Sequence, residues 1–310
     1  IDAIFKYLQY DLEEFMKEFV IVTDTTTDLP RDYVEKHHLY MMSLPYTLEG
    51  TSYTWEKPMP VKDFYDKMRA GSLPTTSQAN PEEAALLYES ILKDNDVDIL
   101  HIAFSSGLSG SFNSCRIASA DVCEKYPDHR IVVVDSLAAT LGQGLLVYKA
   151  VQLKEAGKSL DEVAAWVEEN KYHLVHNFTV DNLFHLHRGG RLSKTAAIVG
   201  TMINLKPVLH VDDEGHLVML SKVRGRKKSL IGLVDCMEKQ LGDWKDKNDI
   251  IFISHGDCPE DAQFVADLIK ERFGYENFMI DYIGATIGAH SGPGTVALFY
   301  LGDQIGRAHV

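Results

Sequence analysis

The chain has 310 residues, and its 45% hydrophobic and 25% charged content is typical of soluble globular proteins rather than disordered, collagenous or membrane-embedded ones. At about 150 residues per domain, this length suggests roughly two domains. Thirty-one basic against 45 acidic residues give a net charge of −14, so the protein's field opposes nonspecific binding to DNA or RNA.

Cysteine usage and the amino end favour a cytoplasmic protein. The cysteines form no C-x-x-C pair, so neither a zinc site nor a disulfide framework is predicted; they are Cys115, Cys123, Cys236 and Cys258. No stretch reaches the ~18 consecutive apolar residues of a membrane span, and acidic residues stand where a signal peptide would be basic. We expect no integral membrane association and no metal site.

Residues 1–18 are predicted to form an amphipathic helix. Apolar residues recur there at alternating spacings of four and three, at Ile1, Phe5, Leu8, Leu12, Phe15 and Phe19. Because Met16 would start a protein comfortably, this segment is interpreted as an N-terminal helical extension, and no functional prediction rests on its first fifteen residues.

Short apolar strands then alternate with longer helical patterns, as in parallel β-α-β winding. The predicted strands are 19–23, 99–104 and 131–134. One helix is predicted over 81–93, with Asn80 as its N-cap and Pro81 at its first position. A second begins at the capping box of Ser159 and Glu162 and runs to about residue 172.

Beyond Phe178 the pattern changes to antiparallel pairing. Two strands, 207–211 and 217–223, flank an Asp-Asp-Glu-Gly turn and predict a hairpin. Further elements are helices over 225–241 and 259–273, a strand over 250–254, and strands near 279 and 296. The fold class is therefore predicted as α/β with two domains: a doubly wound parallel sheet in residues 19–160 and a mixed sheet in residues 161–310.

Three polar loops are candidates for chemistry: 74–78, 105–111 and 288–294. The second follows a strand and opens a helix, so it suits an anion, although serine capping of the helix explains it equally well. The first loop, residues 74–78, is longer than a connection between two helices requires, yet a plain turn also accounts for it. His290 in the third loop is interpreted as a donor or proton carrier, or simply as a packed residue.

Two basic clusters stand out in this acidic chain. Residues 188–193 place two arginines around glycines just before a predicted helix, a geometry suited to phosphate or carboxylate. The second cluster contains Arg224, Arg226, Lys227 and Lys228. These patches suggest an acidic partner surface or a phosphorylated ligand, and a solvated helix end explains them equally well.

Several enzyme classes fit poorly. Residues 107–111 resemble the G-x-S-x-G nucleophile elbow but end in Ser111, and both common nucleotide-binding glycine motifs are missing from the sequence. Four histidines lie close together in the chain, but no metal-binding motif supports them as ligands; they are His173, His176, His185 and His187.

Taken in order, these loops resemble the DegV family of fatty-acid-binding proteins, which includes the lipid-carrying subunits of bacterial fatty acid kinase. The resemblance covers nearly the whole chain after Phe19. Its motifs are V-T-D-T-T-T-D-L-P at 22–30, P-T-T-S-Q at 74–78, S-G-L-S-G at 106–110, D-S at 135–136, R-G-G-R at 188–191, K-V-R-G-R-K-K at 222–228 and H-S-G-P-G at 290–294.

The resemblance implies two α/β domains with a long-chain fatty acid, such as palmitate, stearate or oleate, held between them. It implies that Thr76, Ser106 and His290 bind the carboxylate, and the loops add further candidates: Thr75, Ser77, Ser105 and Gly107. The two hydroxyls would donate hydrogen bonds, and His290 would donate one and, if protonated, also balance the charge.

The resemblance also implies a partner, an ATP-binding kinase subunit that phosphorylates the bound acid. Candidate docking or phosphate-contacting residues are Arg188, Arg191, Arg224 and Arg226. The chain itself is then a carrier without its own ATP site or cofactor, and not an enzyme. Two alternatives are kept: a serine hydrolase or acyl-transferase using Ser106 or Ser109 with His290, and a small-anion sensor.

Overall fold

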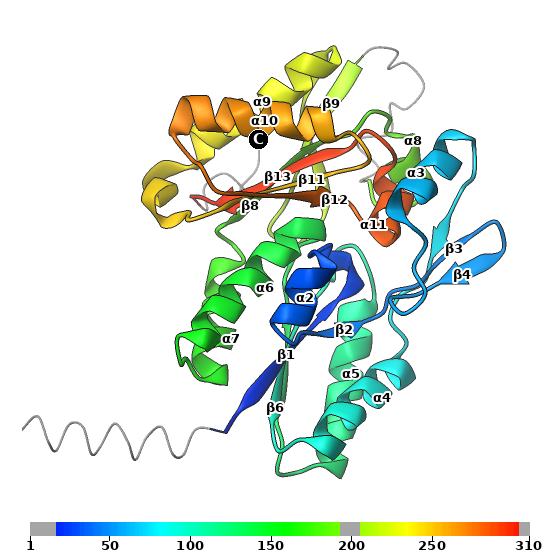
Figure 1. Cartoon of the computed structure of the whole chain (residues 1–310), viewed down its shortest axis with the longest axis vertical. Coiled ribbons are helices and arrows are strands. Elements are labelled where there is room, and N and C mark those ends of the chain that lie inside the picture. Colours follow the sequence, from blue (N-terminus) through cyan, green and yellow to red (C-terminus); the bar gives the residue numbers. More distant parts are fainter. Residues whose placement is uncertain (1–16, 193–204, 304–310) are drawn as a thin grey trace, which may run out of the picture.

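The computed structural model describes residues 17–192 and 205–303, which form two large sheets with helices around and between them (Figure 1). The first sheet is entirely parallel, in the order β2-β1-β6-β7. Its strands are β1 (Phe19–Asp24), β2 (Tyr40–Met42), β6 (Asp98–Ala103) and β7 (Ile131–Asp135). The three predicted strands are confirmed, whereas β2 has too few residues to give a clear apolar pattern.

Helices cover both faces of this sheet, which confirms double winding. Val22 and Ile99 pack on one side with α4 (Pro81–Asp94) and α5 (Ser111–Lys125). Ile21 and Leu100 point to the other side, toward α6 (Thr140–Glu155) and α7 (Leu160–Asn170). This alternation is the period-two pattern of a strand buried on both faces.

The predicted helix starts are confirmed by their caps. The Asn80 side chain accepts a hydrogen bond from the Glu82 amide at 2.9 Å, with Pro81 at the first turn. Ser159 and Glu162 form the complete capping box at the start of α7. Each cap satisfies backbone amides that have no partner inside the helix.

Helix α6 lies between the two sheets (Figure 1). It contacts β6 of the first sheet and β8 (Leu174–Thr179), β11 (Ile251–His255) and β13 (Val296–Leu301) of the second. Residues on every side of it are buried, so its sequence has no polar stripe. A helix that is buried all round lacks amphipathic periodicity, which is why the sequence pattern did not predict α6.

The second sheet is mixed, as predicted, in the order β10-β9-β8-β13-β11-β12. All neighbours are antiparallel except β11 and β12. The hairpin is confirmed as β9 (Leu205–Val211) and β10 (Leu217–Arg224), and β12 spans Phe278–Tyr282. The outer helices are α9 (Arg226–Gln240) and α10 (Pro259–Phe273), and the short helices are η1 (Thr25–Thr27), α2 (Arg31–Lys36), α8 (Phe184–Arg188), η3 (Gly242–Lys247) and α11 (Ala285–Ser291).

Between β2 and α4 the chain leaves the first sheet and forms a small sheet of its own. Strands β4 (Thr51–Tyr53), β3 (Tyr46–Leu48) and β5 (Thr75–Thr76) pair there, and α3 (Val61–Arg69) packs with them. Figure 1 shows this excursion beside α11. The Tyr65 hydroxyl donates to the Ile283 carbonyl at 2.8 Å, so the excursion is attached to the second sheet's side. Residues 74–78 thus include a short strand rather than only a loop.

Two predicted helices lie wholly or mostly outside the residues that the structure describes. The helix over 1–18 lies outside the described residues except for its last two positions, as does the helix expected after Ser193. The domain division at 160/161 remains a prediction, and the contacts of α7 with β6 and β7 favour a position after Asn170. In the described part of the chain, every helix is too short or too polar to cross a membrane.

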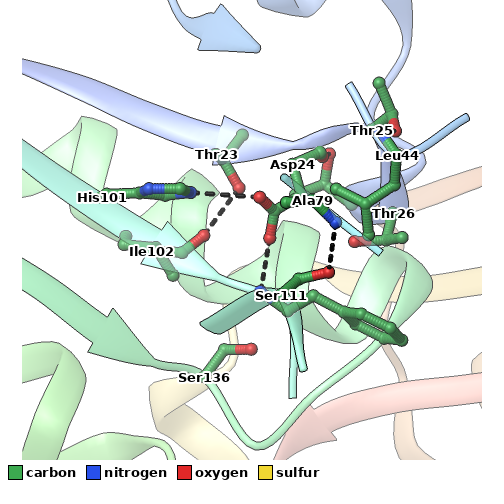
Figure 2. A network of polar contacts seen from close by, with 12 residues as sticks. Thr23, Asp24, Thr25, Thr26, Leu44, Ala79, His101, Ile102, Ser111 and Ser136 are labelled. Carbon is green, nitrogen blue, oxygen red and sulfur yellow. Dashed lines mark hydrogen bonds and ion pairs between the residues drawn. The ribbon is translucent and has the colours of Figure 1, made fainter. Parts of the chain in front are cut away.

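A buried polar network joins the carboxyl ends of β1 and β6 (Figure 2). Asp24 contacts the His101 ring at 3.1 Å and accepts from the Phe104 amide. Gln143 of α6 donates to the same carboxylate at 3.2 Å. Burial by itself lowers the pKa of His101, but the acidic groups of Cys115 and Asp24 outweigh it and raise that pKa above its ordinary value.

Removing this carboxylate should strongly destabilise the fold. We expect Asp24→Ala to lower the free energy of unfolding by about 3–5 kcal/mol, because it leaves the His101 Nε2 atom and the Phe104 amide buried without the partner that Asp24 supplies. Urea unfolding followed by circular dichroism measures this. Asp213→Ala, at an exposed turn position, is the control and should change little; similar values for both variants would contradict the role of the network.

Candidate functional site

The polar loops that are far apart in the sequence meet around one cavity of about 260 Å³. It lies where the loops after β6 face the inner surface of the second sheet. Phe178 and Phe299 line it from that sheet, and Thr76 and His290 line it from β5 and α11. The other apolar lining residues are Leu44, Phe104, Leu108, Ala139, Leu186, Val211, Leu217, Ile283, Ile287 and Ala297, and the other polar ones are Ser77, Gln78, Ser109, Thr140, His176, Arg191, Thr286, Ser291 and Thr295.

Thr76 and His290 are in direct contact, although 214 positions separate them. The Thr76 hydroxyl and the His290 Nε2 atom are 2.7 Å apart. Pairing of Thr76 with Tyr46 holds the threonine, and the last turn of α11 holds the histidine. His290 was expected within a glycine-rich turn; it lies instead at a helix end, and the turn begins at Gly292, whose φ is +82°.

His290 is neutral near pH 7. Burial lowers its pKa to about 4, and the charges of Arg191 and Arg188 add to the effect. Its Nδ1 atom is buried and has no hydrogen-bond partner among the described residues. The histidine can therefore donate or accept at one nitrogen, but the positive charge at this end of the cavity comes from the arginines.

The R-G-G-R segment packs directly against this histidine. A Cβ added at Gly189 would lie 2.3 Å from the His290 Nδ1 atom, so a larger residue there would displace the ring. Arg188 donates to the Pro74 carbonyl at 2.9 Å and to the Ala289 carbonyl at 3.0 Å. It thereby joins the segment before Thr76 to the helix end that carries His290.

Arg191 lines the cavity itself. Its Nε atom donates to the Leu108 carbonyl at 3.2 Å, and its Nη1 atom donates to the Gly189 carbonyl. These two contacts hold a half-buried guanidinium beside the polar end of the cavity. Arginine in such a position is suited to a carboxylate or phosphate ligand.

The serine-rich loop contributes differently from the prediction. Ser106 is exposed, does not line the cavity, and donates from its backbone amide to Asp135 at 3.1 Å. Ser105 is buried and donates to the Gly215 carbonyl at 3.1 Å. A Cβ added at Gly107 would lie 2.5 Å from the Glu214 carbonyl oxygen. Ser105 and Gly107 therefore pack against the β9–β10 turn.

Ser109 is the serine of this loop that lines the cavity. Its hydroxyl lies 2.9 Å from that of Ser111. Ser106 and Ser109 belong to the same predicted loop, and the turn at residues 106–108, which precedes α5, separates them. Ser291 also lines the cavity, with a buried hydroxyl that has no partner among the described residues. It belongs to the predicted loop 288–294 and its H-S-G-P-G motif, but only His290 of that motif was predicted to bind the ligand.

The remaining predicted residues are divided between the site and the surface. Ser77 lines the cavity and is exposed, so the polar end opens to solvent, while Thr75 is exposed and does not line it. Arg224 is exposed at the end of β10. Arg226 is instead paired with Asp261 at 2.7 Å, which fixes it to α10.

The four neighbouring histidines do not form a metal-binding group within residues 17–192 and 205–303. His173 bonds to the Gly302 carbonyl, and His176 lines the cavity. The ligand atoms that come within 4.8 Å of one another in this part of the chain belong to Asp24, His101 and Cys115. Two of these three already serve the hydrogen-bond network of the first sheet.

The arrangement favours binding over nucleophilic catalysis. His290 pairs with Thr76 rather than with Ser106 or Ser109, and no carboxylate reaches its other ring nitrogen within the described structure. A base that is not oriented by an acid, and whose pKa is about 4, is poorly suited to activate a hydroxyl at neutral pH. The hydrolase interpretation therefore gains no geometric support.

The low pKa of His290 can be measured directly. In ligand-free protein, NMR of the imidazole C–H signals should give a titration midpoint near pH 4 for His290. Arg191→Gln should move this midpoint upward, because it removes a nearby positive charge. Arg116→Gln, at an exposed position on α5, is the matched control and should not move it. A wild-type midpoint near 6.5 would contradict the assignment.

Comparisons with known proteins agree on one family. A family model described as an uncharacterised protein of the DegV family matches residues 18–303. A DegV domain-containing protein of Clostridium perfringens is 47% identical over 290 residues, which are 93% of this chain and 99% of that protein. One from Lactococcus lactis is 37% identical over 285 residues, which are 91% and 97% of the two chains.

Solved structures give the same result. A DegV family protein from Thermus thermophilus, described by its fatty acid binding, has a TM-score of 0.81 at 30% identity and covers 92% of this chain and 100% of its own. DegV from Bacillus subtilis, described as a fatty acid binding protein, has a TM-score of 0.80 at 30% identity. The match covers 93% of this chain and 100% of that one. A DegV family protein from Ruminococcus gnavus, described with vaccenic acid, has a TM-score of 0.82 at 25% identity. The match covers 91% of this chain and 99% of that one. From the family match and these relatives, the chain belongs to the DegV family.

Proposed function

We propose that this chain binds a long-chain fatty acid, such as palmitate, stearate or oleate, in the cavity between its two sheets. The observation that carries the proposal is the contact between Thr76 and His290 at the solvent-open end of a mainly apolar cavity. DegV structures from Thermus thermophilus and Bacillus subtilis are described as binding fatty acids, which supports the same ligand class here.

The apolar wall supplies the affinity in this proposal. A sixteen-carbon tail, at about 0.8 kcal/mol per buried methylene, offers roughly 10 kcal/mol of gross transfer free energy before ordering costs. Phe178 and Phe299 are buried at the second sheet and form part of that wall. A ligand with a short apolar part would gain much less, which separates a fatty acid carrier from a small-anion sensor.

The polar end would hold the carboxylate. A buried carboxylate without partners costs several kcal/mol, so it needs donors and a counter-charge. Thr76 and neutral His290 can each donate one hydrogen bond, and Arg191 supplies the charge that His290 does not. Ser106 was expected to donate as well, but Ser109 is the serine that faces this cavity.

Loss of either donor should weaken retention of the acid. We expect Thr76→Val and His290→Phe each to reduce palmitate affinity by roughly 10- to 100-fold, the size of a lost hydrogen bond to a charged group. Organic extraction of purified protein followed by mass spectrometry measures the bound acid, and titration with palmitate measures affinity. A wild-type protein that carries no fatty acid and binds none on addition would overturn the proposal.

The two serines give a matched pair for locating the carboxylate. Ser109→Ala should weaken palmitate binding severalfold, whereas Ser106→Ala should leave it nearly unchanged because that side chain is exposed and outside the cavity. The same titration measures both variants. The reverse order would show that Ser106 turns inward when the ligand binds, as the family resemblance implies.

We further propose that the chain is a carrier that presents the carboxylate to a separate kinase subunit in the cytoplasm. In that reaction a carboxylate oxygen attacks the γ-phosphorus of ATP held by the partner, ADP leaves, and the acyl phosphate stays on this chain. The exposed residues Ser77 and Gln78 at the cavity's polar end are consistent with access from outside. Arg224 is the exposed member of the predicted docking arginines.

Charge reversal tests the docking role. With the ATP-binding subunit of a bacterial fatty acid kinase, ATP and palmitate, Arg224→Glu should lower acyl phosphate formation at least tenfold at limiting carrier concentration, while palmitate binding stays unchanged. Trapping with hydroxylamine measures the product. Arg116→Glu on α5 is the control; equal rates for both variants would remove Arg224 from the docking surface. Arg188 and Arg226 are unsuitable probes because each already holds other parts of the fold.

A further inference from the structure

A second cavity, of about 470 Å³, lies at the carboxyl ends of β1 and β2. It is separate from the fatty acid cavity, and Leu44 and Thr286 line both. The wall between them is held by hydrogen bonds: the Leu44 amide donates to the Thr25 hydroxyl at 3.0 Å, and Thr286 donates to the Leu44 carbonyl at 2.8 Å. The proposed fatty acid function makes no use of this second cavity.

One wall of the second cavity is aromatic. Tyr46 and Tyr53, from the neighbouring strands β3 and β4, stack with ring centres 5.1 Å apart. Trp55 continues this wall, and the thioether side chains of Met41 and Met59 line the same space. Aromatic faces carry negative electrostatic potential, so such a wall attracts cations as well as apolar groups.

Two carboxyl groups line the same cavity, Asp28 from the loop after η1 and Asp281 from β12. The Oδ2 atom of Asp28 is buried and has no hydrogen-bond partner among the described residues. Burial raises the pKa of Asp28 to about 7, hydrogen bonds from Thr140 and Gly284 oppose the rise, and the charge of Asp281 adds to it. A buried acid with an unused oxygen beside a second acid lacks a positive partner.

The nearby arginine does not supply that partner. Arg31 lines the cavity, but its guanidinium lies 4.2 Å from the centre of the Trp55 ring, and its Nη2 atom donates to the Trp55 carbonyl at 2.6 Å. Neither Asp28 nor Asp281 forms an ion pair with any residue in the described ranges. The cavity thus combines two acids that have no ion-pair partner with an aromatic wall, one end of which Arg31 covers.

We propose that this second cavity binds an organic ammonium ion with an apolar body, whose charge faces Asp28 and Asp281 and whose apolar part lies against Tyr46 and Tyr53. Two acids against the single cation of Arg31, which is already held at Trp55, disfavour an anion such as a second fatty acid. The volume accommodates a ligand of at least a substituted aromatic amine's size. This assignment does not depend on what occupies the first cavity.

The test uses the full chain at pH 8 and two probes of equal size, 2-phenylethylammonium and the neutral 2-phenylethanol. Isothermal titration calorimetry should show saturable one-to-one binding of the ammonium ion, at least tenfold tighter than the alcohol. Equal affinities would overturn the proposal by showing that only the apolar wall acts. No saturable binding of the ammonium ion would overturn it as well.

Variants locate the site. Asp28→Asn and Asp281→Asn should each weaken ammonium binding at least fivefold, and Tyr53→Leu should weaken it without removing any charge. Asp213→Asn, at the exposed β9–β10 turn, and Thr76→Val, in the first cavity, should not change it. Thermal unfolding shows whether each variant folds. If Asp28→Asn does not fold, Asp281→Asn and Tyr53→Leu still test the site. Full affinity in both aspartate variants, or loss in Thr76→Val, would place the ammonium ion elsewhere.

Discussion

The packing of α6 between the two sheets is the constraint on which the rest of the structure depends. Leu141, Leu145 and Leu146 are completely or almost completely buried in a core that includes Phe178 and Phe299 of the second sheet. Because one helix serves both sheets, the carboxyl ends of the first sheet's strands must face the inner surface of the second. The loops after β1 and β6 therefore meet α11, and the cavities form along that line of contact.

Electrostatics divides this region into two parts of opposite character. Around the first cavity, burial lowers the pKa of His290, the charges of Arg191 and Arg188 lower it further, and these arginines provide the positive charge. Around the second, Asp28 and Asp281 provide negative charge beside an aromatic wall. Only the Leu44 and Thr286 wall separates them. The two proposed ligands carry opposite charges, so charge would select each against the other, and in a region of low dielectric charge is a strong discriminator.

The excursion that contains β3, α3 and β5 makes the site possible. Tyr65 ties it to the Ile283 carbonyl, and its edge strand carries Thr76 to His290. Without it, Thr76 would have remained an isolated residue in a connection between β2 and α4. The R-G-G-R segment completes the arrangement, since Gly189 leaves room for the imidazole and Arg188 joins both sides. Binding chemistry here is thus a property of contacts between distant segments.

The sequence by itself determined the alternating strands and helices, the capped starts at Asn80 and Ser159, the β9–β10 hairpin and the loops that surround the site, because these depend on local periodicity and turn chemistry. It also paired Thr76 with His290 through family resemblance. Only the tertiary structure decided that α6 is a helix buried on all sides, that Ser109 rather than Ser106 faces the cavity, that Arg226 is committed to Asp261, and that His290 is neutral. Those properties depend on burial and on charges brought together from remote positions, and no local pattern encodes them.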